Sequence, residues 1–354
     1  MAYYIIDKQK IKESISKLKN AFLDKDLDFN LFYSVKTNFA NEVLQVIKEE
    51  GCGFEIVSEL EWNLIKKFKP NSLVLNGPGK SAKLITDILK RTETIFLNID
   101  NDSDIDILRT FDKTLLDKKI KVGIRIYLDR EGVWDRFGYK IPSENLDKKI
   151  EEISDFIKLS GIHFHFSTNN FNLENYRSIF SHINEFINCH IKGLEFLNIG
   201  GGLPAANDFI HQSDIYQKLP GMIAEIFPKL KIISEAGRNI VADAVNIESR
   251  VISVKQLNFD QFMVAVDTNI MHFQCFFEKR FWIEYQVSTK KQKSPKEIVI
   301  FGNSCMQIDK IADNVIIHQE PSVGDRVIIH GVGAYSYSQA ANFISKIPEV
   351  KIYE

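Results

Sequence analysis

Strand-like and helix-like segments alternate along most of this 354-residue chain, and few folds accommodate that pattern. Short apolar runs rich in β-branched and aromatic residues predict strands at Leu31–Val35, Gly53–Val57, Ser72–Leu75, Ile95–Ile99, Lys121–Ile126, Gly161–Phe166, Leu194–Ile199 and Lys231–Ser234. Helical spacing lies between most of them, most clearly over Leu173–Ile191. Eight units over roughly 230 residues favour a closed (β/α)8 barrel, which takes about 250 residues, over an open doubly wound sheet.

The pattern changes after Arg238, where strand-like segments follow one another with little helix between them. These segments are Asn246–Val254, Gln261–Asp267, Phe281–Val287, Glu297–Phe301, Asn314–His318 and Arg326–His330. We therefore predict a second, all-β domain. The expected division is an α/β fold with a TIM barrel over residues 8–240, followed by a C-terminal β-barrel or β-sandwich domain over 241–354 that a strand from residues 1–7 joins.

Charge and cysteine content exclude several classes of protein. The net charge of −2 gives no reason to expect nucleic acid or a membrane surface as a partner. No apolar run reaches transmembrane length, and the N-terminus lacks a signal-peptide pattern. The four cysteines (Cys52, Cys189, Cys275 and Cys305) are scattered, which suggests neither disulfides nor a zinc site. We expect a cytoplasmic protein with free thiols and no metal.

Polar, charged and glycine residues gather at the carboxyl ends of the predicted strands, where barrel enzymes place their chemistry. These ends hold Lys36, Glu55, the segment 76–81, Asn98, Arg125, His165, Gly200, Gly201, Gly202 and Glu235. Lys36 directly follows a buried strand. A lysine there either snorkels to solvent as a strand cap or is paired or used covalently as a Schiff base.

The three glycines lie after the seventh strand, where barrels commonly bind phosphate. Their backbone N–H groups can converge on an anion, although a triple glycine alone also fits a flexible turn. Arg238 adds a cation beside them, or alternatively forms a salt bridge between domains. His163 and His165 point to one face of a strand but lack a third metal ligand. We expect a core position for His163 and stacking on a flat ligand for His165.

A lysine, a phosphate cradle, a stacking histidine and a carboxylate are the parts that hold pyridoxal 5'-phosphate. Lys36 forms the Schiff base, and the glycines take the phosphate. Glu235 keeps the pyridine nitrogen protonated. A protonated ring is the better electron sink and suits loss of CO2 from an α-carbon.

Ordered motifs over nearly the whole chain resemble those of the fold-type III pyridoxal-phosphate-dependent decarboxylases, which include the diaminopimelate, ornithine, arginine and carboxynorspermidine enzymes. They are Tyr33–Asn38 (like Y-A-V-K-x-N), Gly51–Ser58, His163–Thr168, Asn198–Leu203, Glu235–Arg238 (like E-P-G-R), Gly302–Asp309 and Gly333–Ser338. The resemblance implies an alanine racemase-like barrel plus β-domain and a reaction that passes through an aldimine and a quinonoid.

The resemblance also implies roles for individual residues. Lys36 would carry the cofactor and Cys305 would protonate the product in the neighbouring subunit's site, so a homodimer is implied. Without the resemblance, Cys305 also fits a buried core thiol. The residues implied to surround the cofactor are Glu55, Arg125, His165, Thr168, Gly202, Glu235, Gly237, Arg238 and Tyr335.

Departures from the family pattern concern the substrate, for which His272, Met306 and Asp309 are the candidate contacts. Met306 stands where the diamine and diaminopimelate enzymes have an acid that binds the distal amine. His272 stands where diaminopimelate enzymes have an arginine. An apolar partner for a buried ammonium is a mismatch of several kcal/mol. We therefore expect a bulkier amino acid or conjugate, such as a carboxylated polyamine or a siderophore intermediate.

Three alternatives remain open from the sequence. The first keeps the chemistry but with diaminopimelate or ornithine as substrate. The second is an amino-acid racemase of the same architecture; Glu235 and Cys305 argue against it, because racemases usually place an arginine against the pyridine nitrogen. The third is a non-catalytic protein, either a pyridoxal-phosphate carrier or an inactive regulator. The intact Lys36 and Glu235 argue against a regulator, and the β-domain argues against a carrier.

Overall fold

The computed structural model describes residues 1–129, 133, 135–167, 172–190, 193–205, 215–273, 281–287 and 294–353. The chain divides into two compact units. The barrel unit comprises Lys12–Lys36 and Leu44–Asn239, and the β unit comprises Met1–Ile11, Thr37–Val43 and Ile240–Glu354.

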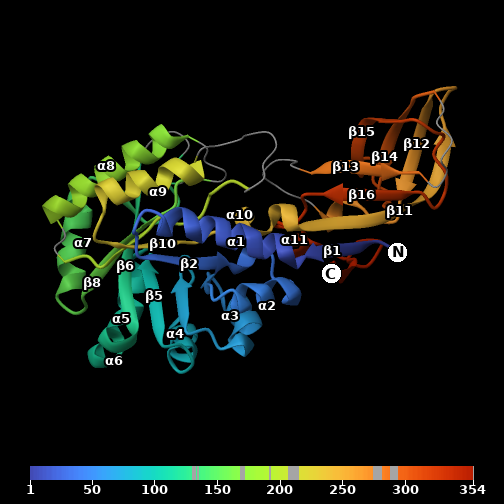
Figure 1. Cartoon of the computed structure of the whole chain (residues 1–354). Coiled ribbons are helices and arrows are strands. Elements are labelled where there is room, and N and C mark those ends of the chain that lie inside the picture. Colours follow the sequence, from blue (N-terminus) through green and yellow to red (C-terminus); the bar gives the residue numbers. More distant parts are fainter. Residues whose placement is uncertain are drawn as a thin grey trace. The chain divides into compact units, whose positions relative to one another are not determined.

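Eight parallel strands close into a ring in the barrel unit (Figure 1). They are β2 (Phe29–Ser34), β3 (Gly53–Ile56), β4 (Ser72–Leu75), β5 (Thr94–Ile99), β6 (Ile120–Leu128), β8 (Leu159–Phe164), β9 (Phe196–Asn198) and β10 (Lys231–Ser234). β10 pairs with β2, and β5 pairs with β6, which completes the closure. The short strand β7 (Tyr139–Ile141) adds only to β6. The predicted (β/α)8 barrel is therefore confirmed.

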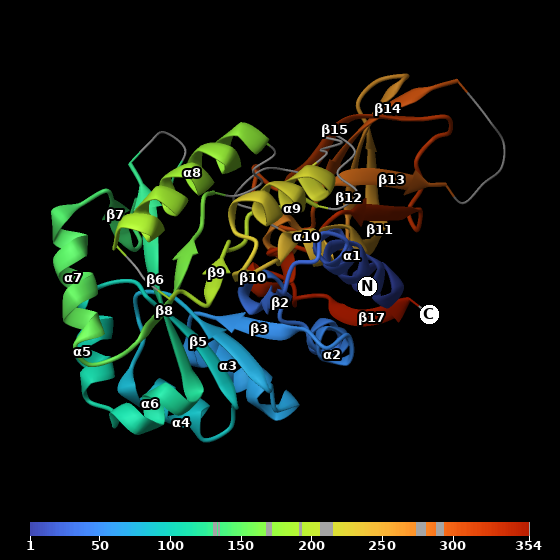
Figure 2. The ribbon, with the colours of Figure 1, turned by 60° about the vertical axis from the view of Figure 1, so that its left-hand side comes forward.

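Helices alternate with these strands and lie outside the ring (Figure 2). They are α1 (Lys8–Leu23), α2 (Asn41–Glu49), α3 (Glu59–Ile65), α4 (Ala82–Leu89), α5 (Asp102–Arg109), α6 (Lys113–Lys119), α7 (Glu144–Ser154), α8 (Leu173–His190) and α9 (Ile215–Ile226). Several begin at a polar cap: the Ser58 and Ser81 side chains accept the Glu61 and Leu84 N–H groups. Such caps satisfy donors that the first helical turn leaves unpaired.

Aromatic side chains fill the interior of the barrel. Phe32, Phe96 and Phe196 meet edge-to-face and share a buried cluster with Val74 and Ile233. Gly161 makes room for them, since a Cβ there would lie 2.3 Å from the Phe196 ring. This packed interior is a core rather than a pore, so a ligand site belongs at an end of the barrel.

The β unit contains one mixed sheet with the order β13-β16-β11-β12-β14-β15. Its strands are β11 (Val245–Gln256), β12 (Gln261–Val266), β13 (Trp282–Gln286), β14 (Lys296–Phe301), β15 (Lys310–Ile317) and β16 (Arg326–His330). β1 (Tyr3–Asp7) pairs with β11 and with β17 (Glu349–Tyr353). The sequence analysis missed β17, because the segment is short and Val350 and Ile352 provide only two alternating apolar positions; four of its five residues are exposed.

Among the helices of the described ranges, none combines the length and hydrophobicity that a bilayer crossing requires.

Candidate active site

Lys36 lies on a short 3-10 turn, Val35–Thr37, that continues directly from β2. Its Nζ donates to Glu55 Oε2 at 2.7 Å. The lysine side chain is 44% exposed, whereas the Glu55 side chain is 1% exposed, so the ammonium is held at the mouth of the barrel by a buried carboxylate. This position supports a reactive lysine over a freely solvated strand cap.

Glu55, on β3, accepts hydrogen bonds at both oxygens. Ser34 Oγ and Lys36 Nζ donate to Oε2, each at 2.7 Å. Asn76 Nδ2 donates to Oε1 at 3.1 Å. The charge of Glu55 is therefore compensated on the side that faces the lysine and hydrogen-bonded on the other.

Glu235 directly follows β10 and is buried. Asn76 Nδ2 and Asn198 Nδ2 donate to its Oε1 at 2.8 and 2.6 Å, and His163 Nε2 lies 3.5 Å from its Oε2. Burial alone would raise the pKa of this carboxyl, but His163, the Asn76 amide and the charge of Lys36 together hold the pKa below its ordinary value. The site thus holds an ionised carboxylate in a buried position, as a protonated pyridine nitrogen requires.

His165 follows β8 and is partly buried. The Gly201 N–H donates to its Nδ1 at 3.2 Å, so the ring proton of the neutral imidazole lies on Nε2. Burial and the nearby Arg125 guanidinium lower the pKa of His165 to about 3. A neutral, oriented imidazole can stack on a flat aromatic ring without adding charge.

The glycine loop after β9 fits closely between two backbone segments. Gly200 and Gly202 have φ values of +65° and +83°, which favour glycine. A Cβ at Gly202 would lie 2.1 Å from the Ser167 carbonyl oxygen, and one at Gly201 would lie 2.8 Å from the Glu235 carbonyl oxygen. Bare backbone is therefore required here, as in a cradle whose N–H groups bind a phosphate. Gly237 and the buried Arg238 follow Glu235 at the start of α10 (Arg238–Val241).

Arg125, on β6, is buried beside this network. Its Nη1 lies 3.5 Å from Asp100 Oδ1, and its guanidinium lies over the Phe137 ring at 4.6 Å. Burial lowers the pKa of Arg125, and the negative charges of Asp100, Glu235 and Glu55 oppose that effect. The guanidinium therefore interacts electrostatically with both site carboxylates, Glu235 and Glu55. This position is compatible with the predicted lining of the cofactor site.

A buried ion pair fixes the loop that carries Asn76. Lys80 Nζ donates to Asp104 Oδ2 at 2.7 Å and to the Gly77 carbonyl at 2.6 Å, and both charged side chains are 1% exposed. The Asp100 N–H donates to the same Asp104 oxygen at 2.8 Å. The loops after β4 and β5 are thereby held together at the carboxyl end of the barrel.

The remaining predicted residues are placed as follows. Thr168 lies outside the described residues. Tyr335, in the β unit, has a φ of +66°, and its N–H donates to the carbonyl of Thr37, the residue after Lys36. Cys305 is exposed, which excludes the alternative of a buried core thiol, and the neighbouring Met306 is partly exposed.

Two of the predicted substrate contacts are buried within the β unit. Asp309 accepts the Ile270 N–H at Oδ1 and the Ser304 N–H at Oδ2, each at 2.9 Å. His272 Nδ1 lies 3.0 Å from Thr268 Oγ1. This geometry gives Asp309 a structural task, which is to join the segment bearing His272 to the loop bearing Cys305 and Met306.

Sequence reasoning did not assign the asparagines that connect the site. Asn76 and Asn98 stand at strand ends, and Asn198 lies inside the glycine motif. Asn98 Nδ2 donates to Asn76 Oδ1 at 2.8 Å, and Asn198 Oδ1 accepts the Gly200 N–H at 2.9 Å. What these asparagines share in the sequence is a neutral amide near the carboxyl end of a strand. That feature alone does not indicate a site residue, because their hydrogen-bond partners are known only from the fold.

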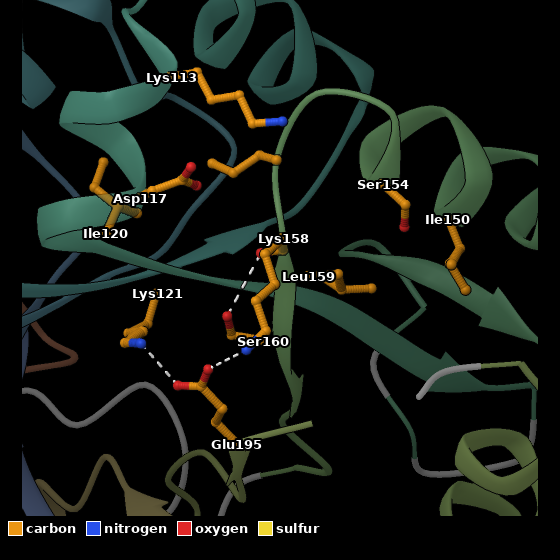
Figure 3. A pocket seen from close by; sticks show the side chains of 11 residues that line it. Lys113, Asp117, Ile120, Lys121, Ile150, Ser154, Lys158, Leu159, Ser160 and Glu195 are labelled. Carbon is orange, nitrogen blue, oxygen red and sulfur yellow. Dashed lines mark hydrogen bonds and ion pairs between the residues drawn. The ribbon is translucent and has the colours of Figure 1, made fainter. Parts of the chain in front are cut away.

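A separate cavity of about 540 Å³ lies at the opposite, amino-terminal end of the strands (Figure 3). Ile120 and Leu159, the first residues of β6 and β8, line it. Glu195 forms ion pairs with Lys121 at 2.8 Å and Lys158 at 2.5 Å at its edge. Because barrel chemistry resides at the carboxyl ends of the strands, this cavity is not the active site.

Comparisons with known proteins agree with this geometry. Residues 8–242 match the family model described as pyridoxal-dependent decarboxylase, pyridoxal binding domain. The chain is 26% identical to a diaminopimelate decarboxylase of Helicobacter pylori, over 97% of this chain and 88% of the relative. It is also 26% identical to a probable chloroplastic diaminopimelate decarboxylase of rice, over 98% of this chain and 73% of the relative.

Solved structures show the same fold. Diaminopimelate decarboxylase of M. jannaschii with L-lysine has a TM-score of 0.86 and 21% identity, covering 100% of this chain and 87% of that one. The arginine decarboxylase of Paramecium bursaria Chlorella virus with agmatine has a TM-score of 0.84 and 18% identity, covering 99% and 95%. The predicted architecture, cofactor and reaction class are confirmed, and the racemase alternative is not favoured. The chain belongs to the pyridoxal-dependent decarboxylases, enzymes that use pyridoxal 5'-phosphate to remove a carboxylate from amino acids.

Proposed function

We propose that the carboxyl end of the barrel binds pyridoxal 5'-phosphate through Lys36 and removes the α-carboxylate of an amino-acid conjugate. The observation that carries this proposal is one buried network that joins Lys36, Glu55, Asn76 and Glu235. It places a partly exposed amine and a buried, ionised carboxylate on one hydrogen-bonded frame. These are the two groups that must meet opposite parts of the cofactor.

When bound, the cofactor supplies an electron sink for the electron pair that CO2 leaves behind. Lys36 Nζ would hold it covalently, and Glu235, whose Oε1 accepts from both amides, would keep its ring nitrogen protonated. The neutral His165 would cover one ring face. The loop of Gly200, Gly201 and Gly202 would lie around the phosphate together with Gly237 and Arg238, and Thr168 and Tyr335 are predicted to add to this site. The Gly200 and Gly201 N–H groups already donate to Asn198 Oδ1 and His165 Nδ1.

Cys305 would return a proton to the substrate's α-carbon after CO2 has left. Thiols suit this step because their surroundings can bring their pKa near neutrality. Cys305 is exposed, and Ile308 on the same loop is 70% exposed, so both side chains are accessible to a second subunit. These exposures support a homodimer in which each subunit supplies Cys305 to the other's site.

Met306 supports a substrate without a free distal ammonium at that position. The Asp309 carboxylate beside it binds two backbone N–H groups and is 0% exposed, so it does not replace the missing acid. We propose a conjugate such as a carboxylated polyamine or a siderophore intermediate. Diaminopimelate is the second candidate, because the relatives in two organisms bear that name.

The test is CO2 release from a panel of substrates by the cofactor-loaded protein. The panel contains diaminopimelate, ornithine, lysine, arginine, carboxynorspermidine and citrate- or diaminopropionate-type conjugates, with Lys36→Ala as the inactive control. Release from conjugates alone supports the proposal. Preferred release from diaminopimelate would keep the reaction and refute the inference from Met306. Racemised product without CO2 would refute both the proposed decarboxylation and the substrate inference from Met306.

A further inference from the structure

Asn76 stands between the two carboxylates of the site. It directly follows β4, is 4% exposed, and its backbone N–H donates to the Ile56 carbonyl at 3.0 Å. Its Nδ2 lies 3.1 Å from Glu55 Oε1 and 2.8 Å from Glu235 Oε1. An amide nitrogen carries two hydrogens, so one side chain serves both acids at once.

The orientation of this amide is fixed. Asn98 Nδ2 donates to Asn76 Oδ1 at 2.8 Å. If the amide turned over, its oxygen would face two carboxylate oxygens and its nitrogen would face the Asn98 donor. Asn98 Oδ1 lies beside Gly123, where a Cβ would be 2.3 Å away, so the absence of a side chain at this position makes room for Asn98. The buried Lys80–Asp104 pair holds the loop that carries Asn76.

The bridge decides which oxygen of each acid remains for chemistry. Both Oε1 atoms face Asn76. The Oε2 of Glu55 therefore faces Lys36, at 2.7 Å, and the Oε2 of Glu235 faces His163, at 3.5 Å. Two buried carboxylates repel each other, and two N–H donors between them offset that repulsion without adding charge.

From this geometry we propose that Asn76 is a positioning residue that couples the two ends of the cofactor site. It keeps Glu55 directed at Lys36 and Glu235 directed at the ring nitrogen. The inference rests on the proposed roles of Lys36 and Glu235. Asn198 offers a matched comparison, because it donates to Glu235 Oε1 at 2.6 Å and accepts the Gly200 N–H at 2.9 Å.

The experiment compares Asn76→Asp with Asn198→Asp in three measurements. The first is the dissociation constant for pyridoxal 5'-phosphate. The second is the 15N chemical shift of the ring nitrogen of labelled, bound cofactor as a function of pH. The third is the pH dependence of Lys36 acylation in the cofactor-free protein, read by mass spectrometry. Urea unfolding monitors folding in each variant.

Each variant replaces an N–H donor to Glu235 by a carboxylate. Losing a hydrogen bond to a charged group should weaken cofactor binding about 10- to 100-fold in both variants. The added negative charge favours protonation of the groups around it, so the ring nitrogen should lose its proton at higher pH than in the wild type. Of the two variants, Asn76→Asp alone should also move the midpoint of Lys36 acylation to higher pH, because Asn76 donates to Glu55, which holds Lys36, whereas Asn198 donates to Glu235.

Equal Lys36 midpoints in the two variants would overturn the coupling. An unchanged ring-nitrogen titration in a folded Asn76→Asp protein would overturn the positioning role altogether. If Asn76→Asp does not fold, two other variants replace it in the experiment. Asn76→Leu removes both donors without adding charge, and Asn98→Ala removes the donor that orients the Asn76 amide. Cofactor affinity within twofold of the wild type in both would also overturn the proposal. Binding of the cofactor at Lys36 of the wild-type protein tests the underlying site separately.

Discussion

The Lys80–Asp104 pair allows a quantitative prediction about the stability of the barrel unit. Both side chains are 1% exposed and their charged atoms are 2.7 Å apart. Lys80→Met would leave Asp104 with the Asp100 N–H on Oδ2 alone, and Asp104 Oδ1 makes no hydrogen bond within the described residues. Leaving a buried charge without its partner costs about 3–5 kcal/mol. That is a large share of a typical total stability of about 5–15 kcal/mol.

Asp104→Asn should cost less, about 1–2 kcal/mol, because an amide oxygen still accepts from Lys80 and the Asp100 N–H. Burial already lowers the pKa of Lys80 against the effect of Asp104, so a lysine without its counter-charge can lose its proton. The double variant Lys80→Met/Asp104→Asn should be more stable than Lys80→Met alone, because no buried charge remains.

The assay is urea unfolding followed by the fluorescence of Trp62, which is buried in α3 of the same unit. Lys83–Glu59 provides the control, since its ion pair has the same 2.7 Å separation but side chains that are 79% and 51% exposed. Lys83→Met should leave the unfolding midpoint unchanged. Equal effects of Lys80→Met and Lys83→Met, or a larger effect of Asp104→Asn than of Lys80→Met, would refute the reasoning.

Three further predictions concern the site. Between about pH 3 and pH 6.5 the unfolded chain binds a proton at His165 that the folded protein does not, so the free energy of unfolding should fall on acidification by up to about 1.4 kcal/mol per pH unit. His165→Asn should flatten that slope in urea titrations at different pH values. An identical slope in the variant would show that His165 is not the neutral, buried histidine described above. Cys305 is exposed, so iodoacetamide should alkylate it far faster than Cys52, whose pKa burial raises to about 11; peptide mapping would measure both rates. Cys305→Ala should slow turnover or divert it to side products while the cofactor stays bound. Normal turnover of this variant would remove Cys305 from the mechanism. Asp309→Asn places an NH2 against one of two backbone donors and should cost about 1–3 kcal/mol and change the alkylation rate of Cys305, whereas an unchanged rate would separate Asp309 from the loop.

Much of this fold could be predicted because its signals are local. Each barrel strand is a short apolar run, and the residue types at its carboxyl end mark where the site lies. The ends of elements were less certain: the strand predicted to end at Val35 ends at Ser34, so Lys36 lies in the middle of the following 3-10 turn rather than directly after the strand. β17 was not predicted because a five-residue segment with two alternating apolar residues, Val350 and Ile352, gives too short a pattern to identify a strand.

The network that organises the site could not be predicted in the same way. Asn76 is 21 residues from Glu55 and 159 residues from Glu235 in sequence, and only barrel closure brings the three together. A neutral asparagine is also common in loops, so its residue type carries little information. Asp309 shows the converse, since the motif suggests a substrate contact while its buried backbone bonds indicate a structural task.

The covalent attachment site of the cofactor tests the central claim most directly. The protein loaded with pyridoxal 5'-phosphate would be reduced with borohydride, digested and mapped by mass spectrometry, with Lys36→Ala as control. The account predicts the phosphopyridoxyl group on Lys36 and its loss in the variant. Attachment to another lysine, or no attachment to a protein that nevertheless releases CO2 from its substrate, would contradict it.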